Sequence, residues 1–188
     1  MHTAILGAGN WGTTLAVNFA RGGHAVWLWE FDAVQAELVQ KSRKNEKFLP
    51  GIELPDSINV TAILNEAVTN AQVIFLCIPT QTSRSVVRQI DALKPGQIIV
   101  SLMKGIEQKT KARVSQICRA ELADFDQDSY AVLSGPTIAA EVARNLPTSA
   151  VIASTSERTA TLIQDAYSSS VLRLYRSDDV VGVETAGA

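Results

Sequence analysis

The sequence predicts an α/β fold built on a doubly wound, mostly parallel β-sheet. Short apolar runs of strand length alternate with helix-compatible segments along the chain, and such alternation is typical of parallel strands joined by right-handed crossovers. The central runs at 73–78 and 97–102 are almost continuously apolar, as strands buried on both faces are. The first strand run opens into the spacing Gly7-x-Gly9-x-x-Gly12.

The expected elements follow one another without an internal repeat or a flexible linker. The expected strands are residues 3–6, 25–29, 58–61, 73–78, 97–102, 130–133, 150–153 and 171–175. The expected helices begin at residue 13 and cover residues 33–43, 63–70, 83–93, 109–123, 138–144 and 156–168. Residues 44–55 contain two prolines and no periodicity, which predicts a loop.

Each glycine of the opening motif has a physical role in a dinucleotide site. Gly7 permits a tight turn, Gly9 permits close approach of a pyrophosphate, and Gly12 permits close packing of helix on strand. Free N–H groups at the helix start, together with the helix dipole, favour the negative charge of that pyrophosphate. Because the motif lies between an expected strand and an expected helix, it predicts a dinucleotide site at residues 7–12.

An acidic residue follows the second expected strand, about 20 residues after the glycines, where dinucleotide sites need one. A carboxylate at Glu30 accepts hydrogen bonds from ribose hydroxyls and repels a 2′-phosphate, which favours NAD over NADP. Asp32 is a second candidate, and Phe31 is placed to cover the adenine face. The alternative is that Glu30 and Asp32 only cap the following helix. The common register of glycines, strand and acid favours the dinucleotide site.

The composition is that of an ordinary soluble protein. With 188 residues, 46% hydrophobic, the chain can bury one sizeable core. A formal net charge of −2 gives no case for a nucleic-acid or membrane-surface partner. No run is long enough to span a bilayer, and no signal peptide is visible. Cys77 and Cys118 are expected as buried small hydrophobes, and the two histidines, His2 and His24, suggest no metal site. We expect a cytoplasmic protein without a metal.

Ligands of doubly wound sheets bind beyond the carboxyl ends of the strands. After residue 78 comes a small polar segment, residues 79–82 (PTQT), suited to a nicotinamide ribose. After residue 102 comes Lys104, which either holds a phosphate or carbonyl oxygen or is a solvated lysine. After residue 133 comes the segment 134–137 (SGPT), which either binds a substrate anion or hydroxyl or caps the next helix. Its spacing favours the cap.

The expected helix 109–123 carries several basic residues: Lys109, Lys111, Arg113 and Arg119. Acidic residues lie among them, at Glu107, Glu121 and Asp124. We therefore expect a solvated face there, not a binding patch.

Taken together, these motifs resemble the amino-terminal part of the bacterial type of NAD(P)-dependent glycerol-3-phosphate dehydrogenase, over all 188 residues. The matching blocks are residues 7–13 (GAGNWGT), 48–52 (FLPGI), 78–79 (IP), 104–107 (KGIE), 132–141 (VLSGPTIAAE), 146–148 (LPT) and 179–184 (DVVGVE). Their number and common order make the match specific.

The resemblance implies a Rossmann fold and a helical second domain. It implies reversible hydride transfer between NAD(P)H and dihydroxyacetone phosphate, which gives sn-glycerol 3-phosphate for phospholipid synthesis. It places Lys104 at both cofactor and substrate, and Gly135 and Thr137 at the substrate. Together with the residues derived above, the expected cofactor contacts are Gly7, Ala8, Gly9, Asn10, Trp11, Gly12, Glu30, Phe31, Pro79, Thr82, Lys104 and Ala139. The full-length protein is expected to be a homodimer. Many bacterial members carry arginine after the second strand, whereas this chain has residues 30–32 (EFD), so we expect NAD in preference to NADP.

The resemblance also implies a lysine, the proton donor and acceptor, in a Leu-Lys-Asn block beyond residue 188. Ketone reduction needs such an acid, so we expect no catalytic residue within this chain and little turnover by it alone. Residues 1–177 are expected to form the dinucleotide-binding domain and 178–188 the truncated start of the all-helical domain. Val180, Val181 and Val183 are then expected to leave an apolar surface. The alternatives are a module that senses the NADH/NAD ratio without catalysis and a related hydroxyacid or 6-phosphogluconate dehydrogenase.

Overall fold

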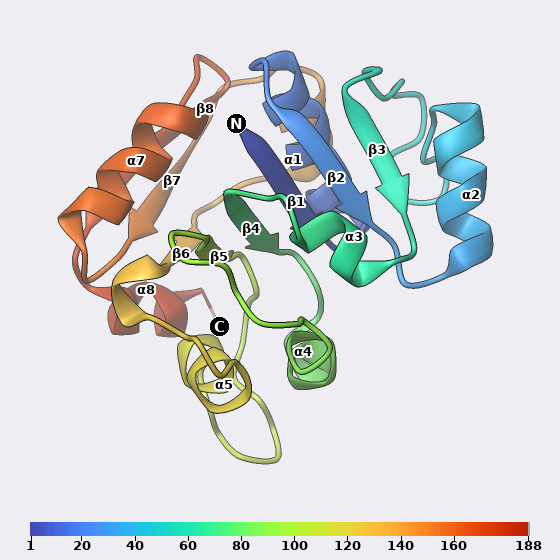
Figure 1. Cartoon of the computed structure of the whole chain (residues 1–188). Coiled ribbons are helices and arrows are strands. Elements are labelled where there is room, and N and C mark those ends of the chain that lie inside the picture. The colour runs from blue at the N-terminus through green and yellow to red at the C-terminus, as the bar shows by residue number, and fades with distance from the viewer. Residues whose placement is uncertain (188) are drawn as a thin grey trace.

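The computed structural model describes residues 1–187, and Ala188, the last residue of the expected second domain, lies outside them. One sheet of eight strands has the order β3-β2-β1-β4-β5-β6-β7-β8, with helices packed around it (Figure 1). The strands are β1 (His2–Leu6), β2 (Ala25–Trp29), β3 (Ile58–Thr61), β4 (Val73–Leu76), β5 (Ile98–Ser101), β6 (Tyr130–Ser134), β7 (Thr148–Ala153) and β8 (Leu172–Ser177). The helices are α1 (Asn10–Arg21), α2 (Ala33–Ser42), α3 (Leu64–Val68), α4 (Thr80–Val87), α5 (Val114–Glu121), α6 (Ala139–Ala143), α7 (Glu157–Tyr167) and α8 (Val180–Ala186), with a 3-10 turn at Gln127–Ser129.

The doubly wound α/β fold is confirmed. β1 lies in the middle of the parallel part and pairs with β2 on one side and β4 on the other. The strand order reverses at this point, because β2 and β3 lie on one side of β1 and the later strands on the other. Loops that leave β1 and β4 therefore part in opposite directions, which opens a crevice at their carboxyl ends. β3 and β8 are the two edges of the sheet.

Two hydrophobic clusters cover the two faces of the sheet, because successive strand residues point to opposite sides. Ile5 belongs to one cluster, together with residues of α1, α2 and α7. Leu6 belongs to the other, together with residues of α3, α4, α5 and α8. Figure 1 shows α2 beside β3 at one end of the sheet and α7 beside β8 at the other. The central strands are thus buried on both faces, as their apolar runs predict.

One strand departs from the parallel pattern. β7 pairs antiparallel with β6, and it pairs parallel with β8. The connection between β6 and β7 holds only the short helix α6, which packs against α1: the Thr14 hydroxyl and the Arg21 guanidinium both donate to carbonyls of α6. Because α6 does not cross the sheet between these strands, the chain turns back beside β6 in the opposite direction.

The region before α5 also differs from the prediction. The helix begins at Val114, not at residue 109, and Lys111 adopts a left-handed conformation with φ 61°. Glu107 is buried and forms an ion pair with Arg84 of α4, and Glu121 pairs with Arg84 and Arg88. The expectation of a solvated face is therefore wrong for Glu107, because arginines of a neighbouring helix bind these carboxylates.

Helix α8 packs on the sheet. Val180 is only 5% exposed and lies in the core, and Val183 packs partly against it, so an apolar surface is the wrong expectation for Val180 and holds for Val181, which is 52% exposed. The buried carboxylate of Glu184 accepts hydrogen bonds from the Ser115 N–H at 2.8 Å and from the Tyr130 hydroxyl at 2.8 Å. The boundary at residues 177 and 178 stays a prediction.

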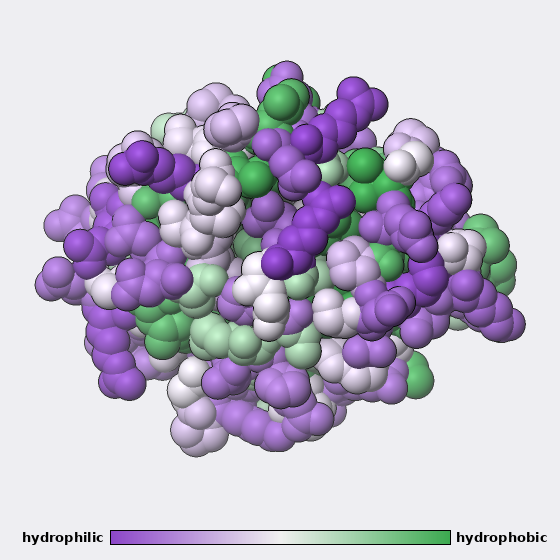
Figure 2. All heavy atoms as spheres, turned by 90° about the horizontal axis from the view of Figure 1, so that it is seen from above, coloured by the Kyte–Doolittle hydropathy of each residue, from purple (hydrophilic) through white to green (hydrophobic). Residues whose placement is uncertain are grey.

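No helix within residues 1–187 combines the length and the apolarity needed to cross a bilayer. Seen from above relative to Figure 1, hydrophilic residues cover most of the face in view, and hydrophobic ones appear in separate patches (Figure 2). Cys77 and Cys118 are both free, and Cys118 is fully buried, while Cys77 is half-buried. Burial raises the pKa of Cys118 to about 12, which makes this thiol unreactive at neutral pH.

His24 generates a prediction about pH. Its ring is buried, stacks on Tyr167 with centroids 4.6 Å apart, and bonds through Nε2 to the Ala166 carbonyl at 2.9 Å. Burial lowers the pKa of His24 below its usual value of 6.5, and the bond to Ala166 opposes this only in part. A lowered folded-state pKa means that the unfolded chain takes up the proton first, so stability is lost as the pH falls below about 6.5.

We expect the free energy of unfolding to fall between pH 7.5 and pH 5.5, and this fall to be smaller in His24→Gln. Urea unfolding at both pH values measures it. His2→Gln, at the exposed chain start, is the matched control and should leave the pH dependence unchanged. An equal fall in His24→Gln and the unaltered chain would exclude His24 as its source.

Candidate dinucleotide-binding site

The glycine turn joins the end of β1 to the start of α1, and its packing is tight. Gly7 has φ +115°, and a Cβ there would lie 2.7 Å from the Cys77 carbonyl oxygen. A Cβ at Gly12 would lie 1.9 Å from the Gly7 carbonyl oxygen. Neither position admits a side chain, because both distances are far below van der Waals contact. The two glycines therefore let α1 begin directly against the ends of β1 and β4.

Gly9, the middle glycine of the motif, lies in open space. Gly9 is the N-cap of α1, without a side-chain cap and without an acidic residue in the first turn. A Cβ built on Gly9 would meet nothing within 4 Å. The first N–H groups of a helix have no partner within it, so the start of α1 offers both donors and room to an anion. Ala8 is buried in this turn, while Asn10 is exposed and Trp11 half-buried at its rim. The turn therefore fits the pyrophosphate of a dinucleotide.

The acidic residues after β2 divide into two roles. Asp32 caps α2, since its carboxylate accepts the N–H groups of Val34 and Gln35. Glu30 is 4% exposed, lies directly after β2, and accepts the Asp32 N–H at 3.2 Å. The capping alternative is thus correct for Asp32 and not for Glu30. Phe31 is 79% exposed and lies at the same carboxyl edge of the sheet.

Two cavities lie beyond the strand ends, and Lys104 lines both of them. The first, of about 320 Å³, is lined by Trp11, residues 77–80, residues 102–104, Thr137 and Ala139. The second, of about 430 Å³, is lined by Lys104, residues 134–136, Val151, Val183, Ala186 and Gly187. The first cavity borders the start of α1, and the second borders the loop after β6 and helix α8. Lys104, an exposed residue, thus borders both a space next to the glycine turn and a space next to Gly135.

The loop that carries Lys104 is tied to helix α4. The Thr80 hydroxyl donates to the Lys104 carbonyl at 2.6 Å, and the Gln81 amide donates to the Ile106 carbonyl at 3.0 Å. The Arg84 guanidinium donates two hydrogen bonds to the Glu107 carboxylate, of 2.9 and 2.8 Å. These bonds from Arg84, joined by one from Thr110, hold the pKa of Glu107 at about 2. Glu107 therefore stays charged, and the ion pair persists across the physiological pH range.

The loop after β6 approaches β7 closely. A Cβ at Gly135 would lie 2.8 Å from the Ser149 carbonyl oxygen and 2.8 Å from the Ala150 Cα, so a side chain there is excluded. Helix α6 begins at Ala139, and its N-cap is Ile138, which forms no side-chain cap. The capping role expected for segment 134–137 is therefore wrong. The half-buried Thr137 lines the first cavity instead.

The structure brings most of the expected residues to one edge. Those that line a cavity are Trp11, Pro79, Lys104, Gly135, Thr137 and Ala139. Thr82 is exposed on the first turn of α4, where its hydroxyl donates to the Pro79 carbonyl, and it lines neither cavity. Thr80, which belongs to the expected segment 79–82, also lines the first cavity, and so does Met103, for which no role was predicted. The position of Met103 directly after the expected strand 97–102 was the available signal.

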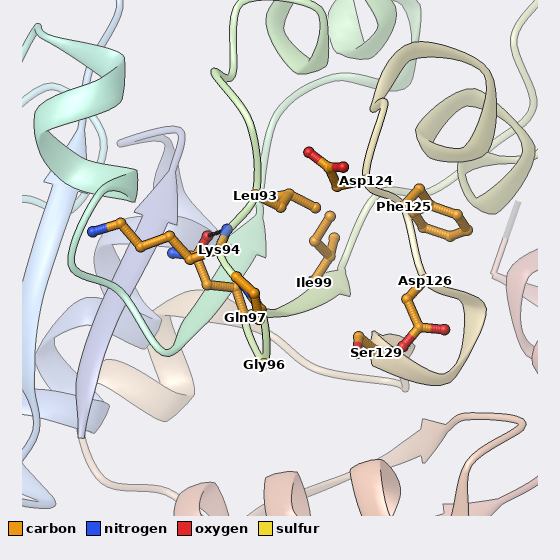
Figure 3. A pocket seen from close by; sticks show the side chains of 10 residues that line it. Leu93, Lys94, Gly96, Gln97, Ile99, Asp124, Phe125, Asp126 and Ser129 are labelled. Atoms are coloured by element: carbon orange, nitrogen blue, oxygen red, sulfur yellow. Dashed lines mark hydrogen bonds between the residues drawn. The ribbon is translucent and has the colours of Figure 1, made fainter.

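A further cavity, of about 460 Å³, lies at the starts of β5 and β6 (Figure 3). Two of its polar side chains have partners within the protein: the Gln97 amide donates to the Val68 and Ala71 carbonyls, and Asp126 caps the 3-10 turn. In Figure 3 the Lys94 side chain extends away from Asp124 and Asp126. In the described part of the chain, no three His, Cys, Asp or Glu side chains are grouped to hold a metal ion. The candidate site is therefore the carboxyl edge.

Comparison with known proteins agrees with this geometry. A family model described as "NAD-dependent glycerol-3-phosphate dehydrogenase N-terminus" matches residues 2–160. The chain belongs to this family. Curated proteins named glycerol-3-phosphate dehydrogenase (NAD(P)+) from Chlorobium limicola and Corynebacterium glutamicum are 41% and 40% identical to the whole chain. The chain covers 57% of each, so it spans a little over half the length of these relatives.

Solved structures of the family have the same fold. A glycerol-3-phosphate dehydrogenase from Coxiella burnetii is 30% identical with a TM-score of 0.89, over 98% of this chain and 56% of that one. The enzyme from Saccharomyces cerevisiae is 25% identical with a TM-score of 0.86, over 100% of this chain and 59% of that one. A ketopantoate reductase from Ralstonia eutropha, at 18% identity and a TM-score of 0.71, shares the fold alone.

The free space around each glycine indicates whether that glycine is needed for folding or for binding. We expect Gly12→Ala to lower the free energy of unfolding by several kcal/mol, because the new methyl group overlaps the Gly7 carbonyl. Gly9→Ala should change it by less than about 1 kcal/mol, since its methyl group meets only open space. The same methyl group fills the space that an anion needs, so Gly9→Ala should weaken NADH binding at least about tenfold. Urea unfolding and fluorescence titration measure the two effects. Unchanged NADH binding by a folded Gly9→Ala chain would contradict the placement of the anion.

Proposed function

We propose that this chain binds NAD(P) as the cofactor-binding part of a glycerol-3-phosphate dehydrogenase, which reduces dihydroxyacetone phosphate to sn-glycerol 3-phosphate for phospholipid synthesis. The observation that carries the proposal is the open, donor-rich start of α1 at the strand-order reversal, in a chain of this family. The family match favours this activity over a related hydroxyacid or 6-phosphogluconate dehydrogenase and over a sensor module.

The residues at the carboxyl edge have distinct proposed roles. The N–H groups at the start of α1 bind the pyrophosphate, and Glu30 binds the adenosine ribose. A bound nicotinamide cofactor supplies the hydride. Lys104 stabilises negative charge, either on the substrate phosphate or on the ketone oxygen as it gains charge. Gly135 offers a surface without a side chain, and the Thr137 hydroxyl orients the substrate. The bond from the Thr80 hydroxyl to the Lys104 carbonyl supports this role, because it fixes the backbone from which the Lys104 side chain extends.

The reaction also needs an acid beside the ketone oxygen. We assign it to the lysine that the family resemblance implies beyond residue 188, and we assign residues 178–188 to the start of the helical substrate domain. The packing of α8 against the second cavity supports this arrangement, because chain that follows α8 starts beside Lys104 and Gly135. For the longer protein we propose a homodimer located in the cytoplasm.

The preference for NAD over NADP rests on Glu30. We expect the unaltered chain to bind NADH at least about tenfold more tightly than NADPH, which corresponds to roughly 1.4 kcal/mol, because the carboxylate repels a 2′-phosphate. Glu30→Gln should bring the two affinities together. Fluorescence titrations with both nucleotides measure the ratio. Glu157→Gln is the matched control, because it removes an exposed charge on α7 and should leave the ratio unchanged. Tighter binding of NADPH by the unaltered chain would reverse the assignment of Glu30.

Binding and turnover should separate in this chain. We expect it to bind NADH and yet to oxidise NADH with dihydroxyacetone phosphate at less than about a thousandth of an ordinary enzymatic rate of 1–1000 per second, because the proposed acid is not among its residues. A spectrophotometric assay at saturating NADH measures this. Turnover at an ordinary rate would show that a residue of this chain supplies the proton.

A further inference from the structure

One buried side chain far along the chain contacts the glycine turn. Asn45 has no exposed surface, and its Nδ2 donates to the Ala8 carbonyl at 2.8 Å and to the Thr13 hydroxyl at 2.9 Å. The Thr13 hydroxyl in turn donates to the same Ala8 carbonyl at 3.1 Å. Two donors therefore hold the carbonyl oxygen of Ala8, in the middle of the turn.

The planarity of the peptide bond gives this contact a consequence. In a trans peptide the carbonyl oxygen and the following N–H point in opposite directions. Fixing the Ala8 oxygen toward Asn45 therefore aims the Gly9 N–H away from Asn45, and a Cβ built on Gly9 meets only open space. Without the two donors, this peptide unit could rotate, and the N–H would no longer have a fixed direction.

Asn45 is itself held by its own loop. Its backbone carbonyl accepts the N–H groups of Phe48 and Leu49, at 3.2 and 2.7 Å. Leu49 is buried, which anchors the loop to the body of the domain. Gln35 of α2 donates to the Asn45 side-chain oxygen at 3.4 Å. The oxygen is occupied in this way, so the amide nitrogen is the end that faces the turn.

The loop between α2 and β3 is held at both ends by hydrogen bonds. Arg43 donates to the Pro55 and Ile58 carbonyls, at 2.6 and 2.8 Å, and Lys44 pairs with Glu53 in an isolated β-bridge. The block at residues 48–52 (FLPGI) therefore belongs to a loop that these contacts hold in place. Asn45 is the buried residue through which this loop contacts the glycine turn. Neither cavity beside Lys104 is lined by residues of this block.

We propose that Asn45 is a positioning residue for the pyrophosphate-binding turn. It touches no ligand, but it sets the orientation of the Ala8–Gly9 peptide whose N–H faces the anion. This inference rests on the proposed function, since it takes the open side of the turn as the pyrophosphate site. A carboxylate cannot replace the amide, because it would face a carbonyl oxygen and a hydroxyl oxygen without the two N–H donors.

Asn45→Asp tests the proposal, because it keeps the shape of the side chain and removes both donors. The titrations use NADH and ADP-ribose, followed by fluorescence and calorimetry, and adenosine, followed by NMR at millimolar concentration. We expect affinity for NADH and ADP-ribose to fall at least about tenfold and affinity for adenosine, which has no phosphate, to change less than about twofold. Asn65→Asp is the matched control: Asn65 also donates to a backbone carbonyl, that of Gln89, on α3 away from the turn.

Thr13→Val keeps the proposal testable if Asn45→Asp does not fold. Valine has nearly the same shape as threonine. The substitution removes the hydroxyl that donates to the Ala8 carbonyl and that accepts a hydrogen bond from the Asn45 amide nitrogen. We expect a loss of about three- to tenfold for NADH and ADP-ribose, again with little change for adenosine. Thermal unfolding of each variant confirms that the titrations are made on folded protein.

The outcomes distinguish the inference from the proposed function. If the unaltered chain binds NADH, and the folded variants bind it within about twofold, Asn45 has no positioning role and the proposed function stands. If the variants lose adenosine and ADP-ribose equally, Asn45 acts on general stability only, which also overturns the inference. If the unaltered chain binds neither NADH nor ADP-ribose, the proposed function fails and the inference fails with it.

Discussion

The contact between the start of α1 and the ends of β1 and β4 is the constraint on which the candidate site depends. The Gly7 carbonyl oxygen lies only 1.9 Å from the place that the Cβ of any other amino acid at position 12 would take. This closeness brings the positive end of a long helix to the strand-order reversal of the sheet. Three of the six residues of this turn are glycines without side chains, and the Ala8 carbonyl within it is held by side chains outside the turn, those of Asn45 and Thr13.

The other strand ends are held by different means. The loop after β5 is fixed by the charged network of Arg84 and Glu107 and by the Thr80 hydroxyl, whereas the loop after β6 is fixed by close backbone packing at Gly135. The central strands are apolar on both faces and cannot present polar groups except beyond their ends. Polar chemistry therefore gathers at one edge of the sheet, and Lys104 stands where two of the resulting cavities meet.

The parts of this structure that depend on local pattern could be predicted from the sequence, and the parts that depend on distant partners could not. Alternating apolar runs predicted all eight strands, and the glycine spacing predicted the turn. The antiparallel direction of β7 and the packing of α6 against α1 both involve segments far apart in the sequence, so no run of residues encodes them. The contacts of Asn45 with Ala8 and of Glu184 with Tyr130 join residues 37 and 54 positions apart, so neither has a local signature.

The two edges of the sheet bear on how this domain can meet other chains. β3 has only four residues, and β8 carries Arg173 and Arg176 on exposed positions. Short edges and charged edges both oppose the addition of a further strand, because a second sheet would have to pair with a brief template or bury guanidinium groups. The domain is thereby protected from open-ended edge-to-edge growth. The short edge and the charged edge do not oppose association through helices or loops in this way.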